Sequence, residues 1–349
     1  MNILFAGSPS IAVPSLKAVS ALEQEGKGIA LAGILTNPDS PRGRQGRFLP
    51  TDVSAAALEL DKARTEKGLK PIPQLKPEKL DARAREEAAA LSPDLLVSFA
   101  YGRIFGPRFL SLFPLGGINI HPSLLPKYRG ASPIPAVILA GEKETGICIQ
   151  RLAAELDTGD ILALERFPLS GRETAFSLSE TVSHKAALLL QKLLRDYSSM
   201  AAQARPQEGE ASYCCQIKKE DGLIDWNKSA EEIDARIRAY TPWPLCFTRR
   251  GNETLYILEA EPLPLSEAAS PGKEAPGKES DTGKEAPAKE RPGATYQPGT
   301  VLGTDSRGIL IQSGRGVLAV SRLQWQAKKA LDWKAFCNGA RDFIGSRLG

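Results

Sequence analysis

Hydrophobic and polar residues follow two alternating patterns along residues 1–198. Short apolar runs predict strands at Asn2–Ala6, Ala30–Thr36, Leu95–Ala100, Gly117–Ile120 and Gly146–Gln150. Apolar residues with helical spacing predict helices at 10–24, 77–90, 132–140 and 174–198. Strands that alternate with helices are typical of an α/β fold with a mostly parallel, doubly wound sheet that has helices on both faces. Ligands of such sheets bind at the carboxyl ends of the strands.

The pattern changes after residues 199–212. This segment, SMAAQARPQEGEAS, loses the periodicity and gains Pro, Gly and Ala, so we interpret it as a linker. Residues 213–349 then predict one helix, at Ser229–Tyr240, and a set of short strands at Trp243–Arg249, Leu255–Ala260, Thr300–Thr304, Gly308–Gln312 and Gly316–Leu323. Short strands with Gly-rich turns favour a small β-barrel as a second domain.

A low-complexity insert interrupts the second domain at about residues 270–294. It repeats a Gly-Lys-Glu-Ala-Pro theme and contains neither an aromatic nor a branched aliphatic residue. Such a segment buries too little apolar surface to offset the entropy that ordering removes, so we expect a disordered loop between two strands. Its positive and negative charges nearly cancel, which makes it a poor arm for binding a polyanion.

The composition of the 349-residue chain, with 42% hydrophobic and 25% charged residues, is typical of soluble globular proteins. No apolar run approaches the roughly 20 residues that span a bilayer, and the start MNILFAGSPS lacks the basic flank of a targeting segment. We therefore expect a cytoplasmic protein without membrane contact. The five cysteines are scattered and lack the spacing of a zinc site, so we expect reduced thiols and no metal.

Positive charge gathers in two regions, although the net charge of the chain is only +4. From Val301 to Gly349, eight Lys and Arg face three Asp, and this local excess fits a polyanionic partner. The second region is RGRQGR, Arg42–Arg47, a glycine-flexed arginine loop that suits the backbone phosphates of a nucleic acid. For both regions, a solvated basic surface is the alternative interpretation.

One of the two histidines lies in a setting that suits acyl transfer. Side chains alternate along a strand, so Asn119 and His121 should share one face while Ile120 points into the core. An amide NH2 stabilises negative charge that develops on a carbonyl oxygen, and an imidazole moves protons near neutral pH. Pro122 and Pro126 then bracket a stiff apolar loop that suits the wall of a pocket for a flat ligand.

Asp157, in the turn LDTGD after an apolar strand, is the candidate partner that orients this histidine. A capping aspartate, a core histidine and a turn asparagine are the alternative interpretation of the same three residues. The other histidine, His184, falls on the polar side of a predicted helix, where we expect no chemical role.

The motifs NIHPSLLPKYRGASPI, at Asn119–Ile134, and LDTGD, at Leu156–Asp160, resemble the signature of the folate-dependent formyltransferases. Further matches point to those members that act on initiator tRNA. They are FAGSP at Phe5–Pro9, NPDSPRGRQGR at Asn37–Arg47, AYG at Ala100–Gly102, KKEDGLIDW at Lys218–Trp226, RAYTPWP at Arg238–Pro244 and AKKAL at Ala327–Leu331. The resemblance covers nearly the whole chain, in order.

The resemblance implies both a fold and a reaction. The fold is a Rossmann-like formyltransferase catalytic domain at residues 1–198, followed by an OB-type β-barrel that binds tRNA at residues 213–349. The reaction transfers a formyl group from the co-substrate 10-formyltetrahydrofolate to the amino group of methionine on initiator methionyl-tRNA, for translation initiation. It requires no metal.

The motifs also imply roles for individual residues. Asn119, His121 and Asp157 are the implied catalytic residues. The implied folate contacts are Tyr101, Gly102, Ser123, Leu124, Leu125 and Pro126. The implied tRNA contacts are Arg42, Arg44, Arg47, Lys328 and Lys329, and Arg44 aligns with the family's critical loop arginine. The Gly-Lys-Glu repeat departs from the family pattern. The arginines at both ends of the loop depart from it as well, which leaves open which arginine dominates the contact with tRNA.

Two other functions stay open at this point. A formyltransferase that acts on a small amine, such as glycinamide ribonucleotide or an amino sugar, shares the catalytic residues but needs neither the RGRQGR loop nor a basic barrel. A non-catalytic RNA-binding protein on a degenerate enzyme fold agrees less well with three intact catalytic residues. We expect a monomer, although the sequence does not determine the oligomeric state.

Overall fold

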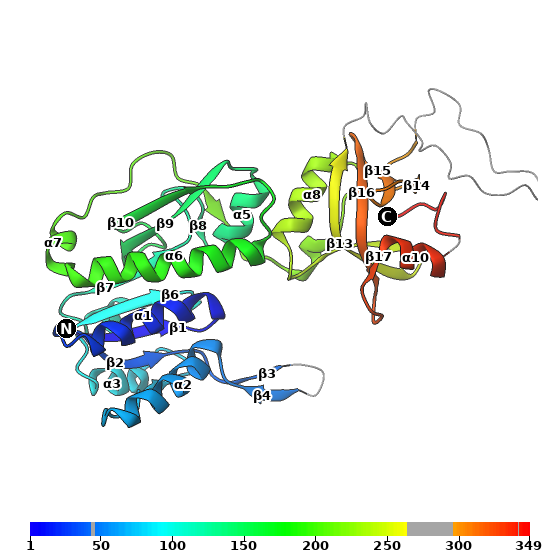
Figure 1. Cartoon of the computed structure of the whole chain (residues 1–349). Helices are drawn as coiled ribbons and strands as arrows, with labels where there is room; N and C mark the ends of the chain where they lie inside the picture. The colour runs from blue at the N-terminus through cyan, green and yellow to red at the C-terminus, as the bar shows by residue number, and fades with distance from the viewer. Residues whose placement is uncertain (43–45, 264–295, 341) are drawn as a thin grey trace, which may run out of the picture. The chain divides into compact units, whose positions relative to one another are not determined.

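The computed structural model describes residues 1–42, 46–263, 296–340 and 342–349 (Figure 1). These residues form two compact units, Met1–Gln216 and Ile217–Gly349. The predicted insert at about 270–294 lies outside the described residues. Within the described ranges, no helix is both long enough and apolar enough to cross a bilayer.

The first unit is built on a seven-stranded sheet with the order β10-β9-β7-β6-β1-β2-β5 (Figure 1). The strands from β7 to β5 in this order are parallel, whereas β9 and β10 are antiparallel to their neighbours at one edge. The bounds are Asn2–Gly7 (β1), Ala30–Leu35 (β2), Gln74–Leu75 (β5), Leu95–Phe99 (β6), Gly117–His121 (β7), Glu144–Arg151 (β9) and Ile161–Pro168 (β10). The predicted α/β class with a mostly parallel sheet is therefore confirmed.

Helices connect and cover these strands. Their bounds are Val13–Gln24 (α1), Asp52–Glu66 (α2), Ala82–Ala89 (α3), Pro107–Leu110 (α4), Pro133–Leu139 (α5), Ala175–Arg195 (α6) and Tyr197–Ala202 (α7). The longest, α6, begins at a capping box in which Thr174 and Ser177 satisfy each other's main-chain N–H groups. It packs against α1 (Figure 1). Its buried residues are mostly leucines and alanines. Every residue of β6 is buried, as expected for a strand that is covered on both faces.

Several elements of the first unit differ from the sequence prediction, and three of them have a clear physical reason. The prediction missed α2, because its buried face consists largely of Ala and Ser and gives no strong apolar stripe. It also missed β10, an edge strand in which charged residues interrupt the apolar run. The helix predicted at 77–90 begins only at Ala82, because Asp81 caps it by accepting a hydrogen bond from the main-chain N–H of Ala84.

The segment 199–212, interpreted as a linker, packs against the first unit. It begins within α7, and Arg205 then forms a β-bridge with Ile161 at the start of β10. Directly after the segment, β11 (Tyr213–Cys214) pairs in parallel with β8 (Arg129–Gly130). Main-chain pairing therefore holds the segment at its middle and directly after its end, which side-chain periodicity does not reveal.

The second unit is an antiparallel sheet with the order β12-β13-β16-β15-β14, and β17 pairs with β16. The bounds are Cys246–Arg250 (β12), Glu253–Leu263 (β13), Val301–Thr304 (β14), Ile309–Gln312 (β15), Val317–Trp325 (β16) and Leu331–Asp332 (β17). Helix α8 (Ala230–Ala239) packs against β13, and α10 (Trp333–Gly339) carries Phe336, whose ring stacks on Trp325. This arrangement agrees with the predicted β-barrel.

Candidate active site

The strand β7 ends at the two residues that the sequence singled out for acyl-transfer chemistry. Asn119 and His121 share one face of β7, and Ile120 between them is buried. On one side β6 pairs Ser98 with Asn119, and on the other β9 pairs Cys148 with His121. Both side chains are thus held by a strand in the interior of the sheet, and His121 is only 3% exposed.

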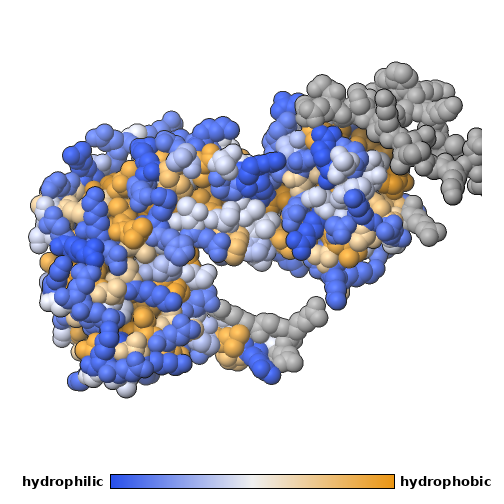
Figure 2. Space-filling model, viewed as in Figure 1, coloured by the Kyte–Doolittle hydropathy of each residue, from blue (hydrophilic) through white to orange (hydrophobic). Residues whose placement is uncertain are grey.

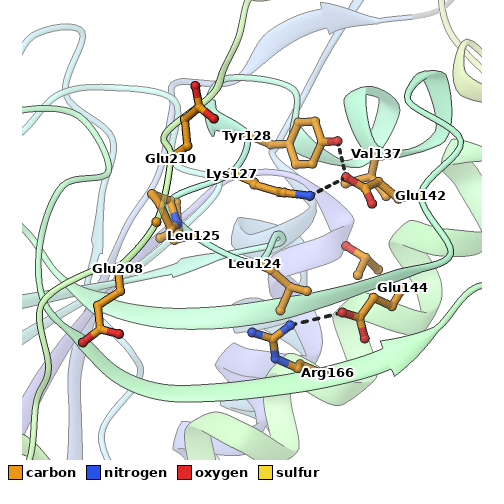
Figure 3. A pocket seen from close by; sticks show the side chains of 13 residues that line it. Leu124, Leu125, Lys127, Tyr128, Val137, Glu142, Glu144, Arg166, Glu208 and Glu210 are labelled. Atoms are coloured by element: carbon orange, nitrogen blue, oxygen red, sulfur yellow. Dashed lines mark hydrogen bonds and ion pairs between the residues drawn. The ribbon is translucent and has the colours of Figure 1, made fainter.

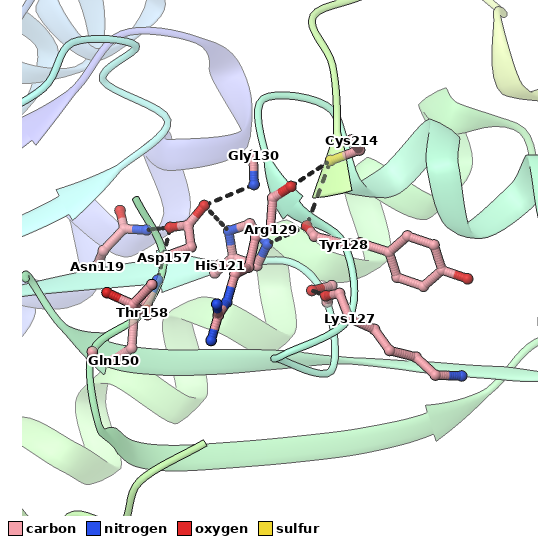
Figure 4. A network of polar contacts seen from close by, with 12 residues as sticks. Asn119, His121, Lys127, Tyr128, Arg129, Gly130, Gln150, Asp157, Thr158 and Cys214 are labelled. Atoms are coloured by element: carbon pink, nitrogen blue, oxygen red, sulfur yellow. Dashed lines mark hydrogen bonds and ion pairs between the residues drawn. The ribbon is translucent and has the colours of Figure 1, made fainter. Parts of the chain in front are cut away.

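Asp157 lies in the turn between β9 and β10 and reaches the same two side chains (Figure 4). Its Oδ2 lies 3.5 Å from His121 Nδ1, and its Oδ1 accepts a hydrogen bond of 3.4 Å from Asn119 Nδ2. The turn is tightly constrained: Asp157 has a φ of 54°, and a Cβ added to Gly159 would lie 1.9 Å from the carbonyl oxygen of Arg151. This backbone path presents the carboxylate to β7.

Two further donors surround the carboxylate of Asp157. Gln150 Nε2 donates to Oδ1 at 2.7 Å, and the main-chain N–H of Gly130 donates to Oδ2 at 2.9 Å. The sequence pattern predicted neither contact. A signal for Gln150 was present, because a glutamine that ends a buried apolar strand needs hydrogen-bond partners. In the described part of the chain, no group of three or more His, Cys, Asp or Glu side chains is arranged to hold a metal ion.

Both ring nitrogens of His121 face hydrogen-bond acceptors. Nε2 lies 2.9 Å from the main-chain carbonyl oxygen of Tyr128, and Nδ1 faces Asp157. Only the protonated ring donates to both, whereas the neutral ring keeps one lone pair. Burial lowers the pKa of His121 below its ordinary value, and the Asp157 carboxylate and the Tyr128 carbonyl oppose that shift only in part. The site therefore contains a neutral imidazole whose protonated form has two acceptors in place.

The loop after β7 carries four residues predicted to contact folate. Ser123 is fully buried, and its hydroxyl donates to the carbonyl oxygen of Lys127 at 2.6 Å. Leu124, Leu125 and Pro126 line a cavity of about 210 Å³ (Figure 3). The hydroxyl of Ser123 is thus occupied within the loop, and the next three residues form an apolar wall.

The opposite walls of this cavity are strongly polar. Lys127 Nζ and the Tyr128 hydroxyl both donate to Glu142, at 3.0 and 2.7 Å (Figure 3). Arg166 forms an ion pair of 3.2 Å with Glu144. None of the three candidate catalytic residues lines the cavity. The cavity and the catalytic cluster are therefore neighbouring features joined by the Tyr128 segment, whose carbonyl contacts the histidine.

Tyr101 and Gly102, also predicted to contact folate, differ in accessibility. The ring of Tyr101 is 2% exposed and stacks on Phe105, with 5.3 Å between the ring centroids. Its carbonyl oxygen accepts a hydrogen bond from Asn37 Nδ2. The side chain of Tyr101 is therefore part of the core, and the contact of this residue with folate stays a prediction. Gly102 is exposed, with a φ of 81° in the left-handed region that favours glycine.

The arginine loop joins the two strands of a hairpin. β3 (Ser40–Arg42) pairs with β4 (Arg47–Leu49), which sets the main chains of the first and last arginines of the loop opposite each other. Arg44 lies outside the described residues. Phe48 is 72% exposed, and Figure 2 shows apolar surface at this hairpin. The hairpin therefore displays an aromatic ring beside the exposed Arg47.

The basic residues of the second unit include both paired and exposed ones. Arg307 forms an ion pair of 2.8 Å with Asp305, and Arg322 pairs with a glutamate at 3.1 Å. Lys328 and Lys329 are exposed in the turn between β16 and β17. Some of the cations counted from the sequence are therefore neutralised by a partner, whereas the two lysines of the AKKAL motif are displayed.

Comparison with known proteins connects this geometry to a family. A model described as formyl transferase matches residues 1–194, and one described as formyl transferase, C-terminal domain, matches residues 216–341. Methionyl-tRNA formyltransferase of Treponema denticola is 49% identical over 348 residues, which cover 99% of this chain and 98% of that protein. Methionyl-tRNA formyltransferase of Borreliella burgdorferi is 34% identical over 345 residues, with coverage of 99% and 98%.

Solved structures share the fold at lower identity. HypX from Aquifex aeolicus, in complex with tetrahydrofolic acid, superposes with a TM-score of 0.57 at 15% identity, over 98% of this chain and 48% of that one. Methionyl-tRNA formyltransferase from Clostridium thermocellum superposes with a TM-score of 0.52 at 19% identity, over 75% of this chain and 93% of that one. At such identities, the superpositions establish the similarity of fold alone.

Proposed function

The chain belongs to the formyl transferase family, and we propose that it transfers a formyl group from 10-formyltetrahydrofolate to the amino group of methionine on initiator methionyl-tRNA. Similarity over the full length to methionyl-tRNA formyltransferases supports this acceptor over a small amine. The arginine hairpin supports it as well, because arginines on an exposed loop suit the phosphates of a nucleic acid. The observation that carries the proposal is the contact of Asn119 and His121 with Asp157 at the end of β7.

Asn119 is placed to stabilise charge on the formyl oxygen. Attack of the neutral methionine amine on the formyl carbon forms a C–N bond and shifts negative charge onto that oxygen. Asn119 Nδ2 carries two N–H groups, and its long contact of 3.4 Å with Asp157 engages at most one of them weakly. The other is available to donate to the oxygen, which is the role of an oxyanion-hole amide.

His121 is the proposed acceptor of the proton that the amine loses. Burial lowers its pKa, so the ring is neutral near pH 7 and ready to accept. The amine reaches Nε2 by displacing the contact with the Tyr128 carbonyl, and Asp157 then stabilises the imidazolium through Nδ1. When the bond between the formyl carbon and N10 of the folate breaks, His121 returns the proton to that nitrogen. The reaction therefore exchanges no net proton.

Substrate binding is assigned to two surfaces. We assign the folate to Gly102 and to the loop Ser123–Pro126, whose apolar wall suits a flat ring. We assign the tRNA to the hairpin that carries Arg42, Arg44 and Arg47, and to Lys328 and Lys329. Arginines and an exposed aromatic ring together suit phosphates and unstacked bases. We propose that the protein is active as a monomer. Light scattering of the active protein tests this oligomeric state directly.

Formylation assays with competing acceptors test the proposed function. The purified protein receives the same formyl donor together with initiator methionyl-tRNA, glycinamide ribonucleotide or an amino sugar. We expect efficient transfer to the charged tRNA and little to either small amine. Preferred transfer to a small amine, or none to any acceptor, contradicts the proposal.

A further inference from the structure

Two glutamines form a chain of amide contacts behind Asp157. Gln207 Nε2 donates to the main-chain carbonyl oxygens of Asp157 and Gly159, at 2.8 and 2.9 Å, and lies 3.2 Å from Gln150 Oε1. Gln150, which is 1% exposed, donates from Nε2 to Asp157 Oδ1 at 2.7 Å. The two side chains together therefore hold both the main chain and the carboxylate of Asp157.

Arg129, which contacts Gln207, determines the orientation of the amide groups of Gln207 and Gln150. Its guanidinium donates to Gln207 Oε1 from Nε at 3.1 Å and from a terminal nitrogen at 2.7 Å. A guanidinium only donates and a main-chain carbonyl only accepts, so the amide of Gln207 has one favourable orientation. The amide of Gln150 is fixed as well, because turning it would set its NH2 against that of Gln207 and its oxygen against the Asp157 carboxylate.

Gln150 also affects which acceptor the amide of Asn119 can reach. Both amides point at Asp157 Oδ1, but Gln150 is at 2.7 Å and Asn119 at 3.4 Å (Figure 4). The closer donor satisfies this oxygen, so the amide of Asn119 stays available for another acceptor. Without Gln150, the carboxylate would draw the Asn119 amide toward itself.

The segment that carries Gln207 also holds Arg129 in place. Tyr213, a few residues further along the chain, lies under the Arg129 guanidinium, with 6.0 Å to the ring centroid. Its strand β11 pairs with β8, which contains both Arg129 and the N–H of Gly130 that contacts Asp157. One short stretch of chain thus contacts the main chain of Asp157 and also the residues that donate to its carboxylate or lie beside those donors.

We propose that Gln150 and Gln207 are positioning residues for formyl transfer, which hold Asp157 so that Asn119 stays free for the formyl oxygen and His121 keeps its orientation. Neither side chain needs to touch the reacting atoms. The proposal rests on the proposed function of the same site, and it assigns a role in that function to the segment between α7 and β11.

Histidine ring NMR tests the proposal without reference to activity. The chain has two histidines, and His184 on α6 is exposed, so it serves as an internal reference for His121. Asp157 contacts the His121 ring, and the thiol of Cys214 donates to the Tyr128 carbonyl that the ring also contacts. Burial raises the pKa of that thiol, so it stays neutral while histidine titrates. Arg129 is the nearby fixed charge, and it faces Gln207.

Gln150→Leu and Gln207→Glu should both shift the titration of His121 to higher pH. Gln150→Leu removes a donor from the Asp157 carboxylate, which then stabilises the imidazolium more strongly. Gln207→Glu keeps an acceptor for Arg129 but removes the N–H donors and adds negative charge. The ring signals of His184 should be the same in the variants as in the wild type.

The same variants should lower kcat for formylation of initiator methionyl-tRNA by about 10- to 100-fold, the effect of losing one hydrogen bond to a charged group, with little change in KM. In the double variant the loss should be little larger than in the worse single variant, because both glutamines act on one carboxylate. Gln203→Glu is the matched control, because Gln203 directly follows α7 and its amide donates to the Ser199 hydroxyl, away from the site. It should leave kcat and the titration of His121 unchanged.

Unchanged kcat and an unchanged His121 titration in folded Gln150→Leu and Gln207→Glu proteins overturn the proposal. Equal losses of kcat in Gln203→Glu overturn it as well, since they indicate a structural role of the whole segment. If Gln150→Leu does not fold, Gln207→Glu at its half-buried position carries the test alone. If the wild type fails to formylate methionyl-tRNA, the proposed function fails, and the titrations still decide whether the glutamines position Asp157.

Discussion

Replacing Asp157 by asparagine should do far more damage than its small change of shape suggests. The carboxylate faces four donors: the side chains of Asn119, Gln150 and His121, and the main-chain N–H of Gly130. An asparagine offers one oxygen and one NH2, so in either orientation two donors meet an NH2 group. An NH2 at the Oδ1 position faces the NH2 groups of Asn119 and Gln150. An NH2 at the Oδ2 position faces the main-chain N–H of Gly130, which cannot turn away. The same NH2 makes His121 accept a hydrogen bond at Nδ1.

The expected magnitudes follow from this conflict. Each buried donor left without an acceptor costs about 1–3 kcal/mol, so the free energy of unfolding should fall by a few kcal/mol. The catalytic loss should be larger, because Asp157→Asn removes the charge that stabilises the imidazolium and also favours the wrong tautomer. The equivalent change in a Ser-His-Asp triad lowers kcat by about 10⁴-fold, and we expect about 10³–10⁴-fold here.

Single-turnover formylation of initiator methionyl-tRNA, measured beside the melting temperature, checks this prediction. Asp160→Asn makes the same chemical change three residues further along the turn, outside the contacts with Asn119 and His121, and should retain nearly full activity. If folded Asp157→Asn protein turned over within tenfold of the wild type, the assignment of Asp157 would be refuted.

Three further predictions follow from the site and the hairpin. Asn119→Ala should lower kcat by about 10²–10³-fold, the loss for one oxyanion donor, and leave tRNA binding in a filter assay unchanged; a smaller loss contradicts its role. Because burial lowers the pKa of His121, the acid limb of kcat/KM should lie below its ordinary value of 6.5. The unfolded chain binds the His121 proton more readily than the folded chain, so the free energy of unfolding should fall as the pH drops below 6.5. A pH–rate profile measures the first effect, and urea titrations at several pH values measure the second. An acid limb of kcat/KM above 6.5 contradicts the account. Arg44→Ala should reduce both the discrimination between initiator and elongator tRNA and the salt slope, the latter by about one unit, because glycines at 43 and 46 let the loop fit closely against a nucleic-acid end. Formylation of both tRNAs across a salt series measures this, and unchanged discrimination would reduce Arg44 to a positioning charge.

The sequence predicted the residues whose placement depends on regular structure. Asn119 and His121 come together because β7 is a regular strand in the interior of a sheet, where alternation alone determines the face. The turn residues after β9 predicted that Asp157 lies near Asn119 and His121. This holds because β9 lies directly beside β7. The family resemblance then added the substrates, which periodicity cannot provide.

The remaining contacts depend on the path of the chain outside regular elements. Gly130 and Tyr128 act through main-chain atoms, and no side-chain pattern reports where a carbonyl or an N–H points. Gln207 lies in a stretch of Pro, Gly and Ala that is typical of a linker, yet main-chain pairing on both sides holds it against Asp157. Tyr101 is a further example, because a motif match does not report that its side chain lies in the core.

The most direct test of the account is single-turnover formyl transfer to initiator methionyl-tRNA by the wild type and by His121→Ala. The account predicts rapid transfer by the wild type, and a loss of at least about 10²-fold in the variant, the usual contribution of a general base, with tRNA affinity unchanged. Near-full turnover by a folded His121→Ala protein would contradict it, because the proton of the methionine amine would then have another acceptor.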